Sequence, residues 1–461
     1  MKILKQACLL SGLYLLPLSA SALNPSAEDR ARGFSDNSAD KSVTFIFDNT
    51  LWKISNLSKV EVRGSFNGWG SDPKFQMSYD SEGNVWTVTV SYPDVKIPGN
   101  SGQPEFKFVT NGSSYQDGGS RSFIPEGYIF KNGDRNNIVV FDDDDFDTIK
   151  ANSATANQVK SVSDFDLTTR AGQEEVSNFR LVPGTSALFR SYHPYKITKT
   201  SNPTEPVRMD YLTRLAVEEG IKSDICLSEK EESNLQAFTI AGAKYTETIA
   251  PYYREIIDKG QVLYVGKANG STPSYNEVYY NSTGNKFAAW VQEIVSFITS
   301  SRSEAPYLIH CRLGTDRTGM FCGVLAALCG ASWDEIAADY QLSNRMGIQE
   351  FRDYHLLQYS FQKLLGVEDI AQVSDVSSAV TEYFVSKGIL TPEEITLLKE
   401  KIGAETSGIL IVEANQAVTV ATEIYTIDGM RVSAHDLQPG LYIRRTVGSD
   451  GSSRTEKLII R

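Results

Sequence analysis

The stretch that decides the fold reads HCRLGTDRTG and covers residues 310–319. The apolar residues PYLIH lead into it from Pro306, and an apolar stretch with helical periodicity follows over residues 320–329. This order predicts a buried strand, then a tight loop that contains Gly314, then a helix. Loop N–H groups and the helix N-terminus would point at one spot, which makes a ready anion-binding site.

Two residues of this loop suit phosphate chemistry. Cys311 stands at its start, where the positive end of the helix lowers the pKa of a thiol and favours the thiolate. Arg317 stands near its end and offers a planar fork of donors to two phosphate oxygens. A thiolate that faces a bound phosphate is a nucleophile for phosphoryl transfer. The sequence therefore predicts that Cys311 attacks phosphorus while Arg317 binds the equatorial oxygens.

The other residues of the loop are expected to complete the phosphate cradle. Backbone N–H groups between Cys311 and the helix would bind the phosphate, and the hydroxyl of Thr318 would donate to the thiolate. His310 is expected to hold the loop backbone rather than to act as a base. No cluster of metal-ligating residues is visible in the sequence, so neither a metal nor another cofactor is expected. The candidate phosphate-binding residues are Arg312, Leu313, Gly314, Thr315 and Thr318.

Four ordered segments resemble the bacterial tyrosine/serine protein phosphatase family, whose loop reads HCxxGxDRTG. NFRLVPGTSALFRS (residues 178–191) is similar to that family's NFRDLGG…LYRS opening. IKSDICLSEKE (residues 221–231) stands where the family has a VIDLR strand, and DEIAADYQLSN (residues 334–344) is similar to EEIVADYLLSN. The resemblance covers about half of the chain and implies a cysteine-dependent phosphatase domain over residues 162–403. Alternating strand and helix patterns in this region also predict an α/β domain with a mostly parallel sheet.

The leaving oxygen of a phosphate ester needs a proton. Many tyrosine phosphatases take this proton from an Asp on a separate loop, but the nearest upstream Asp here is Asp258, which is no strong candidate. The resemblance implies that the Asp within the loop is the general acid, a role that falls on Asp316. The structural alternative is that Asp316 pairs with Arg317 or caps the helix.

Two positions depart from the family pattern. Thr315 stands where the family often has Lys, which weakens the case for polyanionic substrates such as phosphoinositides. Cys226, at a predicted strand end, stands in place of the family's Asp. Because strand ends of parallel sheets converge on the ligand site, Cys226 is a candidate for a protective disulfide with Cys311, if their Cα atoms lie within about 7 Å. The alternative is a small buried core residue.

Residues 42–141 show a different pattern of short strand-like runs separated by turns, such as VEVRGSF, VWTVTVSY and FKFVTN. This pattern predicts a β-sandwich with a core of its own, so that phosphatase turnover would not need it. VEVRGSFNGW…EGNVWTVTV…FKFVTNG resembles the glycogen- and starch-binding modules of immunoglobulin-like fold. The resemblance implies that Trp69 stacks on a sugar and that Lys107 binds hydroxyl groups, whereas Trp86 is expected in the core. The alternative is that the module serves only as a domain partner.

The remaining segments concern export and connection. Residues 1–22 have a basic start, an apolar middle and an Ala-Ser-Ala end, which predicts a signal peptide and an exported protein, in the periplasm or at the cell surface. No later segment approaches membrane-spanning length. Residues 23–41 are expected to be loose, and residues 142–161 are expected to form an acidic, polar linker. The β pattern of residues 407–461 resembles the C-terminal sorting domain of secreted Bacteroidetes proteins.

Composition and motifs together predict a multidomain enzyme. The net charge of −12 argues against nucleic acid as a partner, and the hydrophobic content of 41% argues against disorder. The predicted function is that of an exported, metal-independent phosphomonoesterase with a cysteinyl-phosphate intermediate. Its expected substrate is a phosphorylated protein or small phosphomonoester, and the preferred interpretation is a tyrosine-protein phosphatase of dual specificity. The alternatives are an inositol phosphate or phosphoinositide phosphatase, or an inactive glycan-binding protein.

Overall fold

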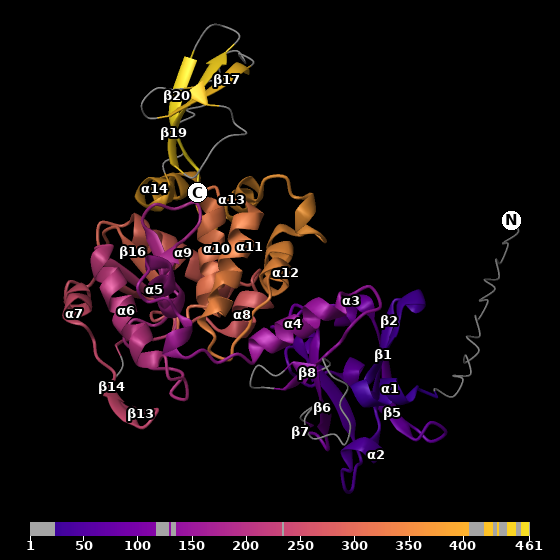
Figure 1. Cartoon of the computed structure of the whole chain (residues 1–461). Helices are drawn as coiled ribbons and strands as arrows, with labels where there is room; N and C mark the ends of the chain where they lie inside the picture. The colour runs from indigo at the N-terminus through magenta and orange to yellow at the C-terminus, as the bar shows by residue number, and fades with distance from the viewer. Residues whose placement is uncertain are drawn as a thin grey trace, which may run out of the picture. The chain divides into compact units, whose positions relative to one another are not determined.

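The computed structural model describes residues 24–116, 129–130, 135–232, 235–404, 419–426, 431–432, 440–448 and 453–460 (Figure 1). The chain divides into two compact units, Met1–Gly403 and Ala404–Arg461. The predicted signal peptide, residues 1–22, lies outside the described residues. The first unit contains an N-terminal β region and a central α/β domain, and both bear on the site described below.

The N-terminal region consists of two antiparallel sheets, which confirms the predicted β structure. One sheet has the strand order β1-β2-β5-β4, and the other has the order β3-β6-β9-β8, with β7 paired to β6. Alternating apolar residues of the two sheets meet in a shared aromatic core, in which the ring centroids of Phe45 and Phe106 lie 4.9 Å apart. The strands are β1 Phe34–Asn37, β2 Ser42–Phe47, β3 Val60–Gly64, β4 Ser78–Asp80, β5 Val85–Ser91, β6 Glu105–Thr110, β7 Ser114–Gln116, β8 Ile129–Phe130 and β9 Asn136–Ile138. Short helices are α1 Ala27–Arg32, α2 Asn49–Trp52 and α3 Tyr92–Val95.

The segment before this core is ordered, contrary to the expectation of a loose start. The side chain of Ser26 caps α1, and Gly33 ends the helix with a φ of 89°. Strand β1 then pairs with β2, so that Phe34 is buried opposite Phe45. The segment is polar overall, but its one buried aromatic residue, Phe34, anchors it to the core.

The predicted linker is also wrong in part, because it contains helix α4 (Phe146–Ala156). Asp145, from the acidic run, accepts hydrogen bonds from two backbone N–H groups at the helix start. Ile149 and Ala156 on this helix pack with Ile138 and with Phe351 of the central domain. The acidic run therefore caps a packed helix rather than forming a solvated hinge.

The central domain contains the predicted, mostly parallel sheet. Its strand order is β10-β11-β16-β12-β15, and only β10 runs antiparallel to its neighbour. Ser191 and Cys226 pair with His310 from either side, so the ends of three strands meet beside Cys311. The strands are β10 Arg180–Leu181, β11 Leu188–Ser191, β12 Ser223–Cys226, β15 Val262–Tyr264 and β16 Tyr307–His310, with a separate hairpin of β13 Ala237–Ile240 and β14 Ala243–Thr246.

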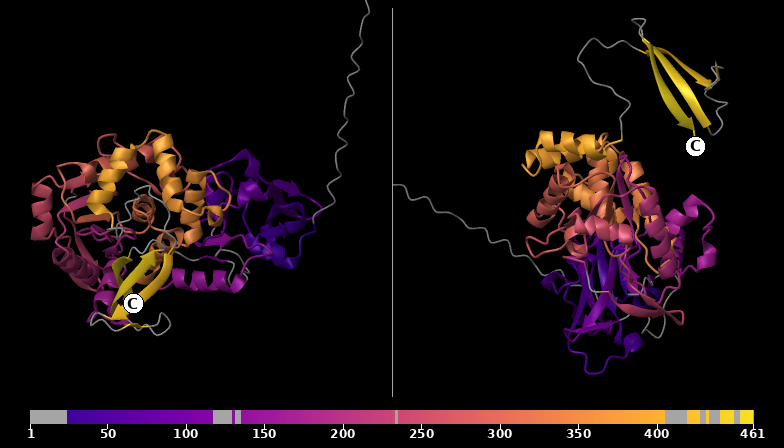
Figure 2. Two further views of the ribbon diagram at one scale, coloured as in Figure 1. Left: turned by 90° about the horizontal axis from the view of Figure 1, so that it is seen from above. Right: turned by 90° about the vertical axis from the view of Figure 1, so that its left-hand side faces the viewer.

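Helices cover both faces of this sheet (Figure 2). On one face Ile225 and Ile309 pack against α9 and α10, and on the other Leu308 packs against α6 and α7. Every residue of α10 from Thr318 to its end is buried, as expected for a helix that is apolar all round. The helices are α5 Arg170–Ser177, α6 Glu205–Glu218, α7 Pro251–Asp258, α8 Tyr275–Tyr279, α9 Asn285–Thr299, α10 Asp316–Leu328, α11 Trp333–Leu342, α12 Tyr354–Leu365, α13 Val376–Ser386 and α14 Pro392–Ile402.

The second unit contains the β structure predicted for the C-terminal segment. Four strands form an antiparallel sheet of order β18-β17-β19-β20. They are β17 Thr419–Thr426, β18 Arg431–Val432, β19 Gly440–Gly448 and β20 Ser453–Ile460. A sorting role for this unit stays a prediction.

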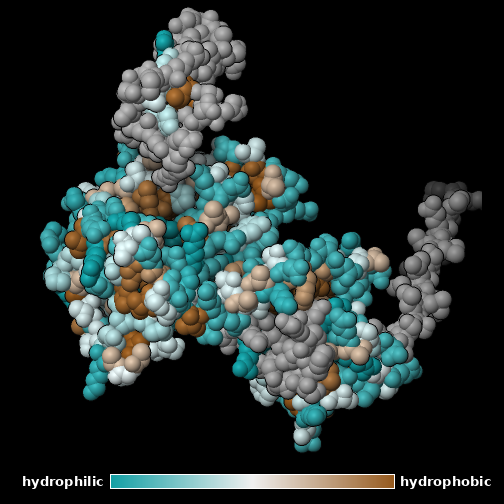
Figure 3. All heavy atoms as spheres, viewed as in Figure 1, coloured by the Kyte–Doolittle hydropathy of each residue, from teal (hydrophilic) through white to brown (hydrophobic). Residues whose placement is uncertain are grey.

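The face shown in Figure 3 is mostly hydrophilic, with apolar residues scattered over it. Among the described residues, no helix combines the length and the apolar character that a bilayer span requires.

Candidate active site

The loop between β16 and α10 has a shape that only glycine permits at one position. Gly314 has a φ of +71°, and a Cβ atom there would lie 2.1 Å from the carbonyl oxygen of Ser191. A side chain would therefore be strained twice, by its backbone conformation and by contact with β11. The close approach lets the loop curl tightly from Cys311 into the first turn of α10.

Two buried side chains, those of Asn178 and Arg190, hold this loop through its carbonyl oxygens. The side-chain amide of Asn178 donates to the carbonyl oxygens of Leu313 and Gly314, at 3.3 and 3.2 Å. Arg190, fully buried, donates to the Gly314 carbonyl at 2.8 Å and also pairs with Asp339.

Asp339 binds a second arginine as well, since the Nε of Arg180 lies 2.6 Å from its carboxylate. Burial alone would raise the pKa of Asp339, but Arg180 and Arg190 lower it below its ordinary value. The motif segments at residues 178–191 and 334–344 thus converge on the loop. The sequence marked those segments as similar to the phosphatase family but indicated no role for these residues. The feature of the sequence that could have identified them is that polar Asn, Arg and Asp residues stand among apolar residues in these segments.

Cys311 lies at the floor of the loop with only 2% of its surface exposed. Burial alone would raise the pKa of its thiol, but the charge of Arg317 and the neighbouring N–H and hydroxyl of Thr318 lower it. The structure thus brings Cys311, Arg317 and Thr318 together in one loop.

Arg317 is half-buried and anchored by backbone. Its Nη1 donates to the carbonyl oxygens of Leu227, at 3.2 Å, and Pro273, at 3.4 Å. In the described part of the chain, no acceptor pairs with its Nε or Nη2. The N–H groups of these two nitrogens are therefore available to bind an oxyanion beside the thiol. Arg312, by contrast, is exposed.

Asp316 has a partner that neither sequence hypothesis named. It is the first residue of α10, and Arg352 binds both of its oxygens, from Nε at 2.5 Å and from Nη2 at 3.1 Å. The hydroxyl of Tyr279 donates to the same carboxylate at 3.1 Å. Arg352 rather than Arg317 is therefore the cation that holds Asp316, and in this arrangement Asp316 is bound as a carboxylate.

Comparison with known proteins bears on this geometry. The model of the tyrosine phosphatase family matches residues 173–402. Those residues form a tyrosine phosphatase family domain. The match runs from within α5 to the end of α14 and includes the loop and the residues that hold it, and it indicates a phosphoric monoester hydrolase. No curated protein matches the chain.

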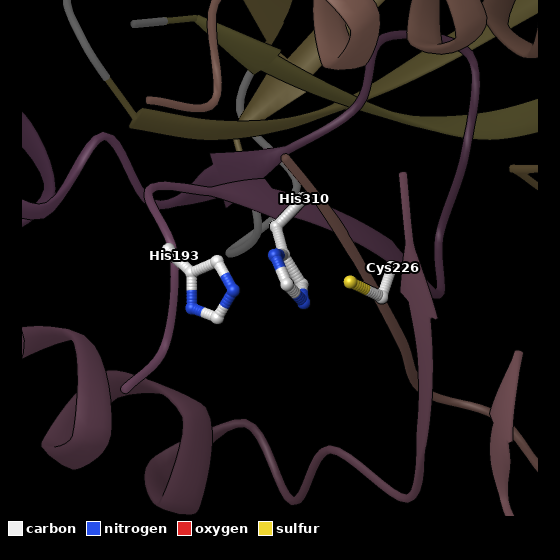
Figure 4. A group of neighbouring side chains, drawn as sticks. All are labelled: His193, Cys226 and His310. Atoms are coloured by element: carbon white, nitrogen blue, oxygen red, sulfur yellow. The ribbon is translucent and has the colours of Figure 1, made fainter. Parts of the chain in front are cut away.

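Behind the loop of this phosphatase domain, three buried side chains lie close enough to consider a metal (Figure 4). One ligand atom each of His193, Cys226 and His310 lies within 4.8 Å of the others. The sequence did not show this cluster, because its members come from three distant segments.

The hydrogen bonds of the two histidines do not suit metal ligation. The Nδ1 of His193 accepts backbone N–H groups, the shorter at 3.1 Å from Lys196, which places its proton on Nε2. His310 faces acceptors with both nitrogens, each at 3.1 Å, namely the Cys311 carbonyl and the Asp224 carboxylate. Burial would lower the pKa of His310, but Asp224 raises it well above its ordinary value. These rings therefore hold protons, and His310 binds the loop backbone as expected.

The same cluster bears on the proposed disulfide. Cys226 pairs with His310 in the sheet and its thiol faces the histidine side, as Figure 4 shows. Cys311 packs instead in the apolar core on the other face of the sheet, with Ile225 and Ile309. Because successive residues of a strand point to opposite faces, the two sulfurs are turned away from each other. Both thiols are free and buried in this arrangement, and the disulfide stays a prediction for an oxidised form.

The two candidate glycan-binding residues meet in a cavity of about 410 Å³ at the edge of the β-sandwich. Trp69 and Lys107 line it together with Asn136 and with Tyr275 and Arg352 of the phosphatase domain. Among the described residues, neither the Lys107 ammonium nor the buried Oδ1 of Asn136 has a partner. Trp86, expected in the core, is only half-buried and lines a different hollow, beside Tyr79.

Proposed function

We propose that the chain is an exported phosphomonoesterase that works through a cysteinyl-phosphate intermediate without a metal ion. Its proposed substrates are phosphorylated proteins, with phosphotyrosine preferred and phosphoserine accepted. One observation supports this most strongly: the buried Cys311 thiol has a lowered pKa and shares its loop with the free donors of Arg317. The tyrosine phosphatase family match supports the same reaction class.

The chemistry proceeds in two steps on this proposal. The Cys311 thiolate attacks phosphorus, and an S–P bond forms as the ester P–O bond breaks. Arg317 and the loop N–H groups bind the three equatorial oxygens as charge spreads over them. The leaving oxygen takes a proton from Asp316. Water then attacks phosphorus and gives a proton back to Asp316, the S–P bond breaks, and inorganic phosphate and the thiolate are released.

Asp316 can act as the acid only after it gains a proton. The bonds from Arg352 hold its two oxygens in a fixed direction at the start of α10. If one oxygen of Asp316 is protonated, it loses its hydrogen bond from Arg352. The bond to the other oxygen then keeps the carboxyl group in place. The role of Asp316 therefore depends on Arg352.

The test of the function is turnover of p-nitrophenyl phosphate by the full chain in the presence of a chelator. Cys311→Ser should abolish turnover, and Cys329→Ser, at a buried cysteine that ends α10, should not. Wild type quenched in acid should carry one phosphate on Cys311 by mass spectrometry. Absence of turnover between about pH 5 and 7.5 would instead favour an inactive binding protein.

The substrate class is separated by a second assay, which compares phosphotyrosine peptides, phosphoserine peptides and inositol phosphates. Nearby lysines are already paired, Lys196 with Glu229 at 2.9 Å and Lys199 with Glu350. Thr315 also adds no charge to the loop. A polyanionic inositol phosphate would meet the exposed Arg312 but neither of these paired lysines, and we expect phosphotyrosine to give the higher kcat/KM. The reverse order would establish the inositol phosphate alternative.

A second candidate function is glycan binding in the cavity that Trp69 and Lys107 line. An aromatic ring, a free ammonium and a free buried amide oxygen are groups that bind a sugar ring and its hydroxyls. Titration calorimetry of the full chain with a soluble glucan oligosaccharide tests it. Trp69→Ala and Lys107→Ala should each abolish binding, and Trp86→Phe should preserve it. No heat with wild type would refute glycan binding.

A further inference from the structure

The segment that carries Arg352, residues 347–353, lies against the N-terminal β-sandwich. The N–H of Asp353 donates to the carbonyl oxygen of Asn100 at 2.8 Å. A Cβ atom on Gly102 would lie 2.7 Å from the Asp353 carboxylate, so the turn at residues 99–102 packs tightly on this segment. The backbone next to Arg352 is thus fixed by a turn of the sandwich.

Helix α4 and the residues after it hold the other side of the segment. Phe351 packs with Ile149 and Ala156 of α4. Two backbone hydrogen bonds follow, from Lys160 to the Gly347 carbonyl at 2.8 Å and from Gln349 to the Gln158 carbonyl at 2.9 Å. The segment is therefore held on both sides by residues that precede the matched phosphatase domain.

Arg352 connects this supported segment to the phosphate loop, because its side chain binds Asp316. The residue is only 7% exposed, and besides the two bonds to Asp316 its side chain donates to Glu350 at 3.1 Å. The other side chain on Asp316 is Tyr279, on α8. This helix meets the same turn of the sandwich, since the hydroxyl of Tyr275 donates to Asn100 Oδ1 at 2.8 Å.

We propose that Arg352 is the positioning residue for Asp316, and that the sandwich turn at residues 99–102 sets where Arg352 and helix α8 stand. The inference rests on the proposed role of Asp316 as general acid. Two parallel bonds from a guanidinium fix both the place and the orientation of a carboxyl group. A carboxyl that must deliver a proton needs that placement within a fraction of an ångström. The sandwich is then part of the catalytic apparatus rather than an appendage.

Leaving-group dependence is the readout that separates positioning from mere support. p-Nitrophenolate leaves without much help, whereas phenolate needs the proton. Arg352→Ala should therefore reduce kcat for phenyl phosphate about tenfold or more beyond its effect on p-nitrophenyl phosphate. KM should change little, because the cradle from Cys311 to Thr318 is untouched. Arg352→Lys should recover part of the difference. Equal losses on both esters would make Arg352 a structural residue only.

The contact of the sandwich with α8 is tested by Asn100→Ala and by Tyr275→Phe, which remove the two ends of the hydrogen bond between Tyr275 and the Asn100 side chain and leave the backbone bond from Asp353 in place. Each should show the same selective loss on phenyl phosphate, and the double variant should lose no more than the larger single. Asn37→Ala, within the first sheet of the sandwich, is the matched control and should behave as wild type. Wild-type behaviour of Asn100→Ala would overturn the role of the sandwich.

A second readout does not require turnover. The negative charge of Asp316 raises the pKa of Cys311, and Arg352 neutralises that charge. The pH midpoint of Cys311 alkylation by iodoacetate should therefore move upward in Arg352→Ala and, to a smaller extent, in Asn100→Ala. Unchanged midpoints would refute the link between Arg352 and the loop. The midpoint could move as expected in a protein that shows no phosphatase activity. In that case the proposed function fails, but the conclusion that Arg352 positions Asp316 stands.

Discussion

Arg317 stabilises charge through its geometry as much as through its sign. Backbone carbonyls hold one end of its guanidinium, and the remaining N–H groups form a planar fork beside the Cys311 thiol. A lysine ammonium is a point charge that cannot bind two oxygens in one plane. This single side chain therefore carries a sharp test of the phosphate cradle.

We expect Arg317→Lys to reduce kcat about 100-fold or more, the usual cost of losing an oxyanion donor. The measurement is steady-state kinetics with p-nitrophenyl phosphate, with Arg214→Lys as the control on the exposed face of α6. Activity within a few-fold of wild type would show that charge alone is sufficient.

Thr318 controls the pH at which the nucleophile becomes available. Its hydroxyl and N–H help to lower the pKa of Cys311, so the thiolate exists at a pH where a free thiol would stay protonated. Thr318→Val removes the hydroxyl and should raise that pKa. The acid limb of the kcat/KM profile should then move to higher pH, while the plateau rate at higher pH changes less.

The matched control for this prediction is Thr299→Val, whose hydroxyl only caps a carbonyl within α9. An acid limb that stays in place in Thr318→Val would assign the lowered pKa to Arg317 and the helix terminus alone.

Strand β16, the loop and helix α10 form one element pair, and Gly314 is its most constrained point. Gly314→Ala should abolish activity and lower the free energy of unfolding by more than about 2 kcal/mol, because it adds a clash to a strained φ. Gly388→Ala isolates the strain, since Gly388 has a φ of +65° with open space around it, and it should cost about 1 kcal/mol. Urea unfolding measures both, and equal losses would show that the loop relaxes around the added methyl.

Elements with strong periodicity were predictable, and those held by long-range partners were not. The residues around Cys311 predicted a strand, a loop and a helix, because the pattern of each element lies within a short stretch of sequence. The alternation of strand and helix patterns predicted the parallel sheet. Helix α4 was missed because an acidic run reads as solvated until its N-cap is recognised. Arg352 was missed because nothing within its own segment marks it. Its partner Asp316 and its support Asn100 lie far from it along the chain.

The first unit as a whole works as one body rather than as two modules. The β-sandwich has its own core, as predicted, but its turn at residues 99–102 also supports the segment that carries Arg352. We therefore revise the expectation that turnover does not need the sandwich. A chain that lacks residues 24–141 should keep much of its rate on p-nitrophenyl phosphate and lose its rate on phenyl phosphate.

Circular dichroism and urea unfolding of this truncated chain show whether its phosphatase domain is folded. If the truncated chain is folded and has wild-type rates on both esters, the sandwich is an independent module that turnover does not need.

Asn100 and Asp353 belong to different domains, yet on this proposal they must be inherited together. A gene that exchanged its N-terminal module by recombination would retain Cys311 and Arg317 intact, because both lie within the matched domain. Its product would still cleave activated aryl esters, the usual laboratory substrates, while becoming slow on phosphotyrosine. Screening such hybrids with a chromogenic ester alone would therefore overlook the defect, and natural selection on the true substrate would not.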